Sequence, residues 1–223
     1  MRARSPDPFP ASGDEVDYSP FSYQARQNTP LFPTCKVQNT PLFCKVVHSH
    51  CNGLPLQADS DPRVYKLIFM DIGLMNAVCG LDRSAIDRMS ETRLVNEGAM
   101  AEQFVGQHLQ GLLADSPNRE LTYWLREGRS SNAEVDYVAA FDGRIVPIEV
   151  KAGASGALKS LHQFVAEKEV PLAVRFDAAP ASIQTVRTRV QQGDSKADVA
   201  YRLVSLPLYL VERLPSLLKS LPT

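Results

Sequence analysis

Three short apolar runs follow one another between residues 121 and 153, and the second and third contain carboxylates. Runs of this length separated by turn residues predict three successive β-strands. Read with a period of two, the second run places Glu134 and Asp136 on one face, and the third places Glu149 and Lys151 on one face. A β-hairpin explains the alternation, but it does not explain acids on faces that also carry apolar residues. The other face of the second run is predicted to hold Val135, Tyr137, Ala139 and Phe141.

A long helix is predicted from about residue 91 to residue 113, where apolar residues recur at the spacing of helical turns. Glu102 falls inside the apolar stripe of this helix. Buried carboxylates are usually paired or bound to a metal, because an unpaired one is costly. Two interpretations of Glu102 therefore stay open: a salt-bridged residue at the edge of the stripe, or a metal ligand. The stripe is predicted to contain Leu94, Gly98, Ala101, Val105, His108, Leu109 and Leu112, and the opposite face Gln103, Gln107 and Gln110.

The segments around these elements extend the pattern. Before the long helix, residues 64–70 predict a buried strand, and Asp71 is placed to cap a short helix that follows, with a catalytic role as the alternative. After the three strands, the sequence predicts a helix within residues 155–170 and a strand at 171–177. A last strand is predicted at 204–214. The core therefore reads helix, strand, strand, strand, helix, strand.

Residues 1–45 are predicted to be a disordered leader, and residues 46–223 to be the folded domain. Seven of the sixteen prolines lie in the leader, and no helical or strand period holds there. The near-duplicate segments QNTPLFPTCKV and QNTPLFCKV follow one another within it. Two copies are too few to stack into a solenoid.

Charge and hydropathy bound the classes of partner. The net charge of −1 gives no strong overall field for nucleic acid or an acidic membrane, so contact with DNA would need a local basic patch. No apolar run approaches the roughly 18 residues of a membrane span. Arg2 and Arg4 are not followed by the apolar segment of a secretory signal. We therefore expect a cytoplasmic protein without membrane contact.

The four cysteines are few and irregularly spaced, which predicts reduced thiols rather than disulfides. Two of them, Cys44 and Cys51, lie close to His48 and His50 in the sequence. The spacing C-x3-H-x-H-C fits none of the usual zinc patterns. These residues are therefore interpreted as polar loop residues, with a zinc site as the alternative.

The order of elements and the placement of the acids resemble the PD-(D/E)XK nuclease superfamily, whose core has an αβββαβ arrangement. The matching residues are Glu102 on the first helix, Asp136 in EVDYV on the second strand, and Glu149 and Lys151 in EVK on the third. Gln163, on the following helix, resembles a glutamine of the RecB-like branch. The resemblance implies an α/β fold with a mixed sheet flanked by helices.

A closer resemblance, from about Val46 to the end, is to the domain of unknown function 4143. It is carried by LPLQADSDPRVYKLIFMDIGLMNAVCGL, GAMAEQFVGQHL, YWLREGRSSNAEVDYV, IVPIEVKAG and LPLYLVERL. In bacterial and archaeal proteins this domain follows an AAA-type ATPase domain. The present sequence contains no G-x-x-x-x-G-K-[ST] loop, so we expect a truncated or split member whose ATPase is a separate partner.

The nuclease resemblance implies that Asp136 and Glu149 hold Mg²⁺ or Mn²⁺, with Glu102 as a further ligand or hydrogen-bond acceptor. Lys151 would orient the attacking water or stabilise the transition state, or else it simply pairs with Glu149 on an exposed strand. Glu134 and Gln163 are secondary candidates. Arg126 and Arg129 are candidate phosphate contacts, although solvated loop arginines are the simpler interpretation.

The implied function is a Mg²⁺-dependent nuclease-like domain that hydrolyses nucleic-acid phosphodiesters. The alternative is a catalytically silent adaptor that binds nucleic acid or a partner protein and is normally attached to an AAA-type ATPase. A third possibility is the remnant of a broken gene.

Overall fold

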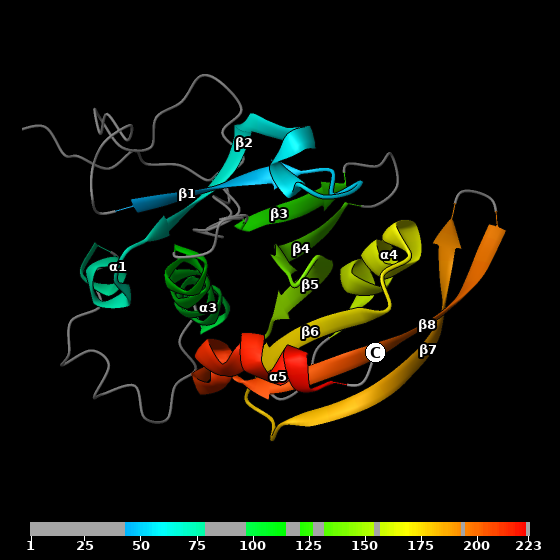
Figure 1. Cartoon of the computed structure of the whole chain (residues 1–223). Helices are drawn as coiled ribbons and strands as arrows, with labels where there is room; N and C mark the ends of the chain where they lie inside the picture. The colour runs from blue at the N-terminus through cyan, green and yellow to red at the C-terminus, as the bar shows by residue number, and fades with distance from the viewer. Residues whose placement is uncertain are drawn as a thin grey trace, which may run out of the picture.

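The computed structural model describes residues 43–78, 97–114, 121–126, 132–153, 157–192 and 195–221. The predicted leader lies outside this part of the chain, except that its last three residues belong to the first strand (Figure 1). The first described strand therefore begins close to the predicted boundary at residue 46.

A mixed eight-stranded sheet runs through the described residues in the order β2-β1-β3-β4-β5-β6-β8-β7 (Figure 1). The pairs β1–β3, β5–β6 and β6–β8 are parallel, and the other neighbours are antiparallel. Asp142 and Gly143 connect β4 to β5 with φ of 49° and 75°, as a tight hairpin turn requires. The strands are β1 (Phe43–Ser49), β2 (Ser60–Phe69), β3 (Leu121–Arg126), β4 (Ala133–Phe141), β5 (Arg144–Val150), β6 (Leu172–Asp177), β7 (Ser182–Gln192) and β8 (Ser195–Pro207).

Helices cover both faces of this sheet (Figure 1). One face packs against α3 (Glu97–Ala114), η3 (Leu208–Arg213) and α5 (Leu214–Ser220) in one apolar cluster. The other face packs against α4 (Lys159–Lys168) and η2 (Leu56–Asp59) in a second cluster. A short helix, α1 (Ile72–Val78), lies beside α3. The prediction of a mixed sheet flanked by helices is therefore confirmed.

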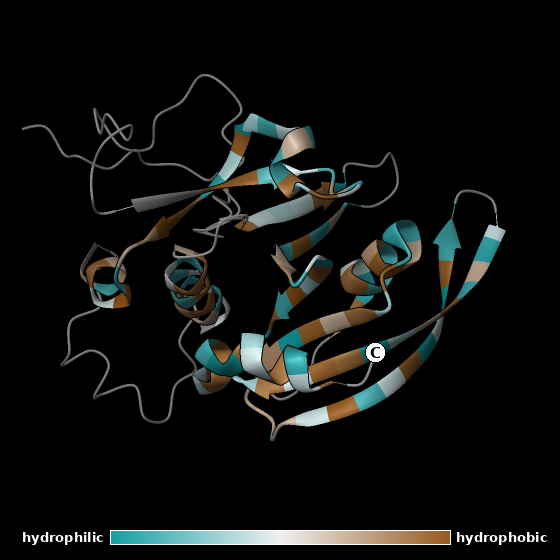
Figure 2. Ribbon diagram, viewed as in Figure 1, coloured by the Kyte–Doolittle hydropathy of each residue, from teal (hydrophilic) through white to brown (hydrophobic). Residues whose placement is uncertain are grey.

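The predicted order of helix, three strands, helix and strand is found as α3, β3, β4, β5, α4 and β6. The strand predicted at 204–214 is confirmed only for residues 204–207, the end of β8 (Ser195–Pro207), and is wrong beyond them, where the chain turns into η3. Strand β7, which pairs along its length with β8, was not predicted. Figure 2 shows polar and apolar residues mixed along this ribbon without a regular alternation. The aliphatic residues of β7, Ile183, Val186 and Val190, are three and four positions apart, so the sequence shows no period of two there.

Helix α3 lies close against the sheet at Gly106. A Cβ added there would stand 2.6 Å from the Ile68 side chain and 2.8 Å from the Tyr137 ring. The Tyr137 hydroxyl donates to the carbonyl oxygen of Glu102 at 2.9 Å, so helix and strand are joined beside the first predicted acid.

The polar face predicted for α3 is wrong at Gln103, which is 2% exposed. Its side-chain amide accepts from the Phe69 N–H at 3.0 Å and donates to the Phe69 carbonyl at 2.7 Å. Because β2 and α1 cover this side of α3, a glutamine that pairs with the backbone can be buried there. Leu94, the first residue of the predicted apolar stripe, lies outside the described residues.

Candidate functional site

A β-bulge in β4 decides where the second predicted acid points. Thr122 pairs with Val138 and Trp124 pairs with Val135, so β4 has one residue more than β3 between these two pairs. Val135 and Val138 consequently both join the apolar cluster on the α4 side, whereas Tyr137 joins the cluster on the α3 side. The strict period of two predicted for this run is therefore wrong at the bulge, a feature that often re-aims a side chain.

The bulge and α3 bring three carboxylates together. Glu102, Glu134 and Asp136 each offer one oxygen, and these oxygens all lie within 4.8 Å of one another. All three residues are partly buried. Burial, and then the charges of Glu102 and Glu149, raise the pKa of Asp136 well above its usual value. The sequence-derived candidates Glu102, Glu134 and Asp136 therefore share one site.

A lysine that was not among the predicted site residues lies among these acids. The Lys66 ammonium on β2 is 2.8 Å from Glu102 Oε1, pairs with Glu134, and donates to the Asp136 carbonyl oxygen at 3.4 Å. It also lies 4.9 Å from the centre of the Tyr123 ring. Burial alone would lower the pKa of Lys66, but the carboxylates around it raise the pKa well above its usual value.

The signal for Lys66 was present in the sequence. Lys66 and Ile68 share one face of a strand that was predicted to be buried, and both are buried. A lysine on such a face requires a carboxylate partner. The sequence could not name the partner, because Glu102 lies 36 residues away.

Glu149 and Lys151 form a second, adjoining part of the site. Glu149 is 4% exposed, and its Oε1 lies 2.5 Å from the Lys151 ammonium. Its Oε2 is buried and has no hydrogen-bond partner among the described residues. Burial raises the pKa of Glu149, while Lys151 opposes this effect. The pairing of these two residues on one strand face was an open alternative from the sequence, but the acid of the pair is buried rather than exposed.

Asp136 lies between the two parts. Its Oδ2 accepts a hydrogen bond from the Val150 N–H at 2.7 Å, and its pKa responds to both Glu102 and Glu149. Glu149 is nevertheless not in the group of ligand atoms within 4.8 Å that the described residues form. The structure thus brings Glu102, Glu134 and Asp136 into contact range and leaves Glu149 beside them.

Gln163 faces other partners. With its amide oriented to suit its neighbours, Gln163 accepts from the Arg126 guanidinium at 2.6 Å and donates to the Gln191 carbonyl at 3.2 Å. These bonds tie α4 to β3 and β7. Arg126 is thereby placed against a glutamine, and Arg129 lies outside the described residues.

The minor candidates are also placed. Asp71 Oδ1 accepts from the Leu74 N–H at 2.8 Å, as the capping prediction requires. Cys51 is buried with its thiol directed to the Ser49 carbonyl, and burial raises the pKa of that thiol to about 11. Among the side chains described, neither Cys51 nor a histidine belongs to a possible metal-binding group.

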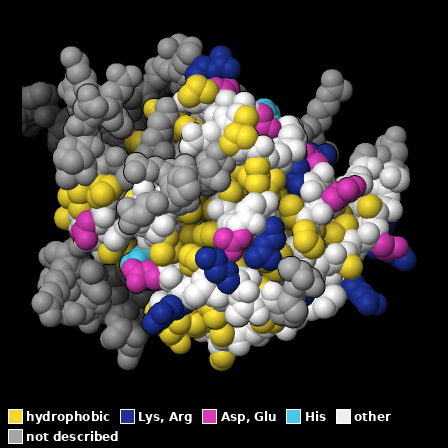
Figure 3. Space-filling model, in the orientation of Figure 1, with side chains coloured by type: hydrophobic (Ala, Val, Ile, Leu, Met, Phe, Trp, Pro, Cys, Tyr) yellow, Lys and Arg dark blue, Asp and Glu magenta, His cyan; other side chains and the backbone are white. Residues whose placement is uncertain are grey.

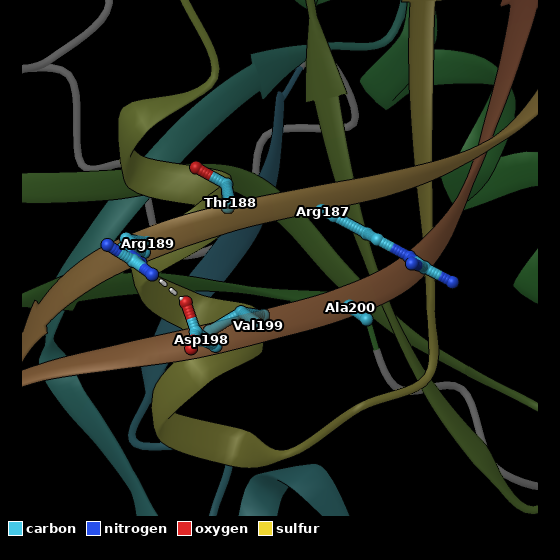
Figure 4. Close-up of a pocket in the computed structure, with 6 residues that line it drawn as sticks. All are labelled: Arg187, Thr188, Arg189, Asp198, Val199 and Ala200. Carbon is cyan, nitrogen blue, oxygen red and sulfur yellow. Dashed lines mark hydrogen bonds and ion pairs between the residues drawn. The ribbon is translucent and has the colours of Figure 1, made fainter.

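The outer face of the β7–β8 ribbon holds basic residues. A hollow on this ribbon is lined by Arg187, Thr188, Arg189, Asp198, Val199 and Ala200 (Figure 4). Arg189 Nε donates to Asp198 Oδ1 at 2.8 Å, and both side chains are mostly exposed. Through the strand register, Arg187, Arg189, Lys196 and Arg202 fall on the same face.

Comparison with protein families gives one match. Residues 97–208 match the model of a family described as Domain of unknown function (DUF4143), and this span contains all the candidate acids. No curated protein and no solved structure matches the chain. Within the described residues, no helix has the length and apolar character to cross a membrane.

Proposed function

The chain belongs to the DUF4143 family, and we propose that its domain is a Mg²⁺-dependent nuclease-like hydrolase of nucleic-acid phosphodiesters. The observation that supports this proposal best is the position of Asp136. The β4 bulge places its carboxylate next to Glu102, while its pKa also responds to the buried Glu149 on the neighbouring strand. A buried acid whose pKa is raised by neighbouring acids in this way is typical of a functional site.

The residues present fit a hard divalent cation. All the donors are carboxylate oxygens, and the buried Glu149 Oε2 has no hydrogen-bond partner among the described residues. Magnesium prefers oxygen ligands and needs only one or two carboxylates besides water and phosphate. We assign Asp136 and Glu149 as the ligands of Mg²⁺ or Mn²⁺, and Glu102 as a neighbouring acceptor. When bound, the metal would lower the pKa of a water molecule and neutralise phosphate charge.

The chain's own groups would orient the reaction. The Val150 N–H holds the Asp136 carboxylate in one position. Burial would lower the pKa of Lys151, but Glu149 raises it above its ordinary value, so the side chain keeps its charge at neutral pH. A fixed ammonium of this kind can stabilise the negative charge that develops on a phosphate in the transition state.

DNA is the proposed substrate, and the β7–β8 ribbon is the proposed contact surface. Its outer face carries four basic residues and one acid, Asp198, which pairs with Arg189. In Figure 3, which shares the orientation of Figure 1, acidic and basic side chains are interspersed over the described surface. Basic side chains in a row bind backbone phosphates without reading the sequence. A two-stranded ribbon also has the dimensions to enter the major groove.

The nuclease proposal is tested by cleavage. Linear, circular and single-stranded DNA and an RNA are incubated with the purified protein and Mg²⁺ or Mn²⁺. We expect Asp136→Asn and Lys151→Ala each to lower the rate by about 100-fold or more, because each removes a group that acts in the transition state. Arg63→Ala is the control, since Arg63 is exposed and pairs only locally with Asp61. Equal rates for the wild type and both variants on every substrate would refute the proposal.

A second function, a catalytically silent adaptor, is favoured by Lys66. Its ammonium already pairs with Glu102 and Glu134, which leaves fewer acids for a metal. In this case the domain binds nucleic acid or a separate AAA-type ATPase, the partner that the resemblance implies. Binding of DNA measured by fluorescence anisotropy, without cleavage in any metal, would support this function. If the protein neither binds nor cleaves DNA, an adaptor function toward nucleic acid is excluded.

A further inference from the structure

We propose that the Lys66 ammonium takes the place of a divalent cation between Glu102 and Glu134, and thereby confines any catalytic metal to Asp136 and Glu149. The second half of this inference rests on the proposed function. The first half concerns only how the acids are held, and it stands or falls without any cleavage activity.

The geometry of Lys66 is that of a cation inside a ligand set. Its Nζ lies 2.8 Å from Glu102 Oε1 and contacts Glu134, two of the three residues whose oxygens lie within 4.8 Å of one another. Only 7% of the lysine side chain is exposed, so water is a minor neighbour. The ammonium is a compact point charge, and it resembles a metal ion in this respect more than a planar guanidinium does.

The Lys66 ammonium contacts the three acidic residues in two different ways. It meets the side chains of Glu102 and Glu134, but at Asp136 it reaches the backbone carbonyl oxygen, 3.4 Å away. The Asp136 carboxylate is instead held by the Val150 N–H. Two acids thus share the single positive charge of the lysine, and the third is directed toward the strand that carries Glu149.

A divalent ion would be repelled from this cluster while the lysine is there. The ion would have to stand within a few ångströms of the ammonium, and like charges at that distance in a partly buried site repel strongly. Removing only the lysine charge leaves three carboxylates that repel one another. The same three oxygens would then suit Ca²⁺, which accepts flexible sets of oxygen ligands.

Lys66→Met tests the inference, because methionine keeps an unbranched side chain and removes the charge. The matched control is Lys168→Met, since Lys168 is also mostly covered and pairs with a single acid, Glu167, at 3.1 Å. Ca²⁺ is titrated into metal-free protein, with NaCl of equal ionic strength as the reference. The thermal unfolding midpoint and the half-saturating Ca²⁺ concentration are measured, and no nucleic acid is present.

We expect Lys66→Met to have a lower midpoint than the wild type in EDTA and to recover it with Ca²⁺. Its half-saturating Ca²⁺ concentration should be at least tenfold lower than those of the wild type and Lys168→Met. It should also be at least tenfold lower than that of Lys66→Arg, which keeps the positive charge. The gain should disappear in Lys66→Met/Glu134→Gln, which lacks one of the proposed ligands. If Lys66→Met does not fold without metal, refolding in Ca²⁺ should restore its near-UV circular dichroism.

The inference is overturned if Lys66→Met responds to Ca²⁺ no more than the wild type, if the gain survives the loss of Glu134, or if Ca²⁺ does not restore folding. A Glu134-dependent gain in a protein that cleaves nothing would reject the proposed nuclease while keeping Lys66 as the resident cation. Cleavage by the wild type, together with no gain in the Ca²⁺ response of Lys66→Met, would keep the proposed nuclease and reject Lys66 as the resident cation.

Discussion

The Asp136 carboxylate accepts a 2.7 Å hydrogen bond from the backbone N–H of Val150, one strand away. The regular pairing of β4 with β5 ends at Tyr137 and Ile148, one residue before this bond. The Asp136 side chain therefore continues the contact with β5 beyond the last backbone pair, beside the bulge in the pairing of β4 with β3. This bond fixes the carboxylate between Glu102 and Glu149, and the first prediction concerns its charge.

Asp136→Asn should stabilise the metal-free protein at alkaline pH. Burial, then Glu102 and Glu149, raise the pKa of Asp136 in the folded state, so the folded protein keeps its proton to higher pH than the unfolded chain. Stability must then fall as pH rises from the ordinary pKa of 3.8 through the raised pKa. We therefore expect the stability of Asp136→Asn to exceed that of the wild type by an amount that grows as pH rises toward pH 8.

Urea unfolding of the wild type and Asp136→Asn in EDTA, from pH 4 to pH 8, measures this effect. The asparagine can still accept from Val150 through its side-chain oxygen, so the difference should be smallest at the acid end of this range and should grow as pH rises. A difference that is constant with pH would show that the charge of Asp136 is not its cause.

Gly106→Ala should lower the free energy of unfolding. The new Cβ would crowd Tyr137 and Ile68, and overpacking of this kind typically costs about 1–3 kcal/mol. Gly111→Ala is the matched control on the same helix, because nothing lies within 4 Å of the added atom. That control should gain about 0.5–1 kcal/mol, since alanine favours the helix more than glycine does. Chemical denaturation of both variants measures the contrast, and a stabilised Gly106→Ala would contradict the close approach.

Arg187→Ala should weaken DNA binding and reduce its dependence on salt. Each lost phosphate contact lowers the slope of log K against log salt by about 0.9. Arg189→Ala should have a smaller effect, because Asp198 already neutralises part of the Arg189 charge. Arg63→Ala is the control, since β2 lies at the opposite edge of the sheet from β7. Fluorescence anisotropy at several salt concentrations measures the slopes, and equal slopes for all four proteins would exclude the ribbon as a contact surface.

Asp71→Ala should lower stability by about 1 kcal/mol without changing divalent-ion binding or cleavage. The Asp71 carboxylate caps α1 through the Leu74 N–H, and losing such a cap has an effect of this size. Asp71→Asn should be close to the wild type, because asparagine caps a helix about as well. Thermal unfolding measures the loss, and a selective loss of cleavage in Asp71→Asn would instead assign Asp71 a role in the reaction.

Much of the site was predictable, because local pattern decides which residues occupy strands and helices. The runs that became β4 and β5, the helix carrying Glu102 and the cap at Asp71 all follow from short-range periodicity. The ribbon strand β7 was missed for the same reason. Seven of its eleven residues are exposed, so its composition resembles that of a loop.

The sequence by itself determined the elements that carry the site, their order and which acids they hold. Only the tertiary structure decided where those acids point. Strict alternation places Val135 and Tyr137 on one face, but the bulge, set by the pairing of β4 with β3, separates them and turns Asp136 toward Glu102. Lys66 likewise depends on residues distant in the sequence. Its buried charge requires acidic partners, and these come from helix α3 and strand β4.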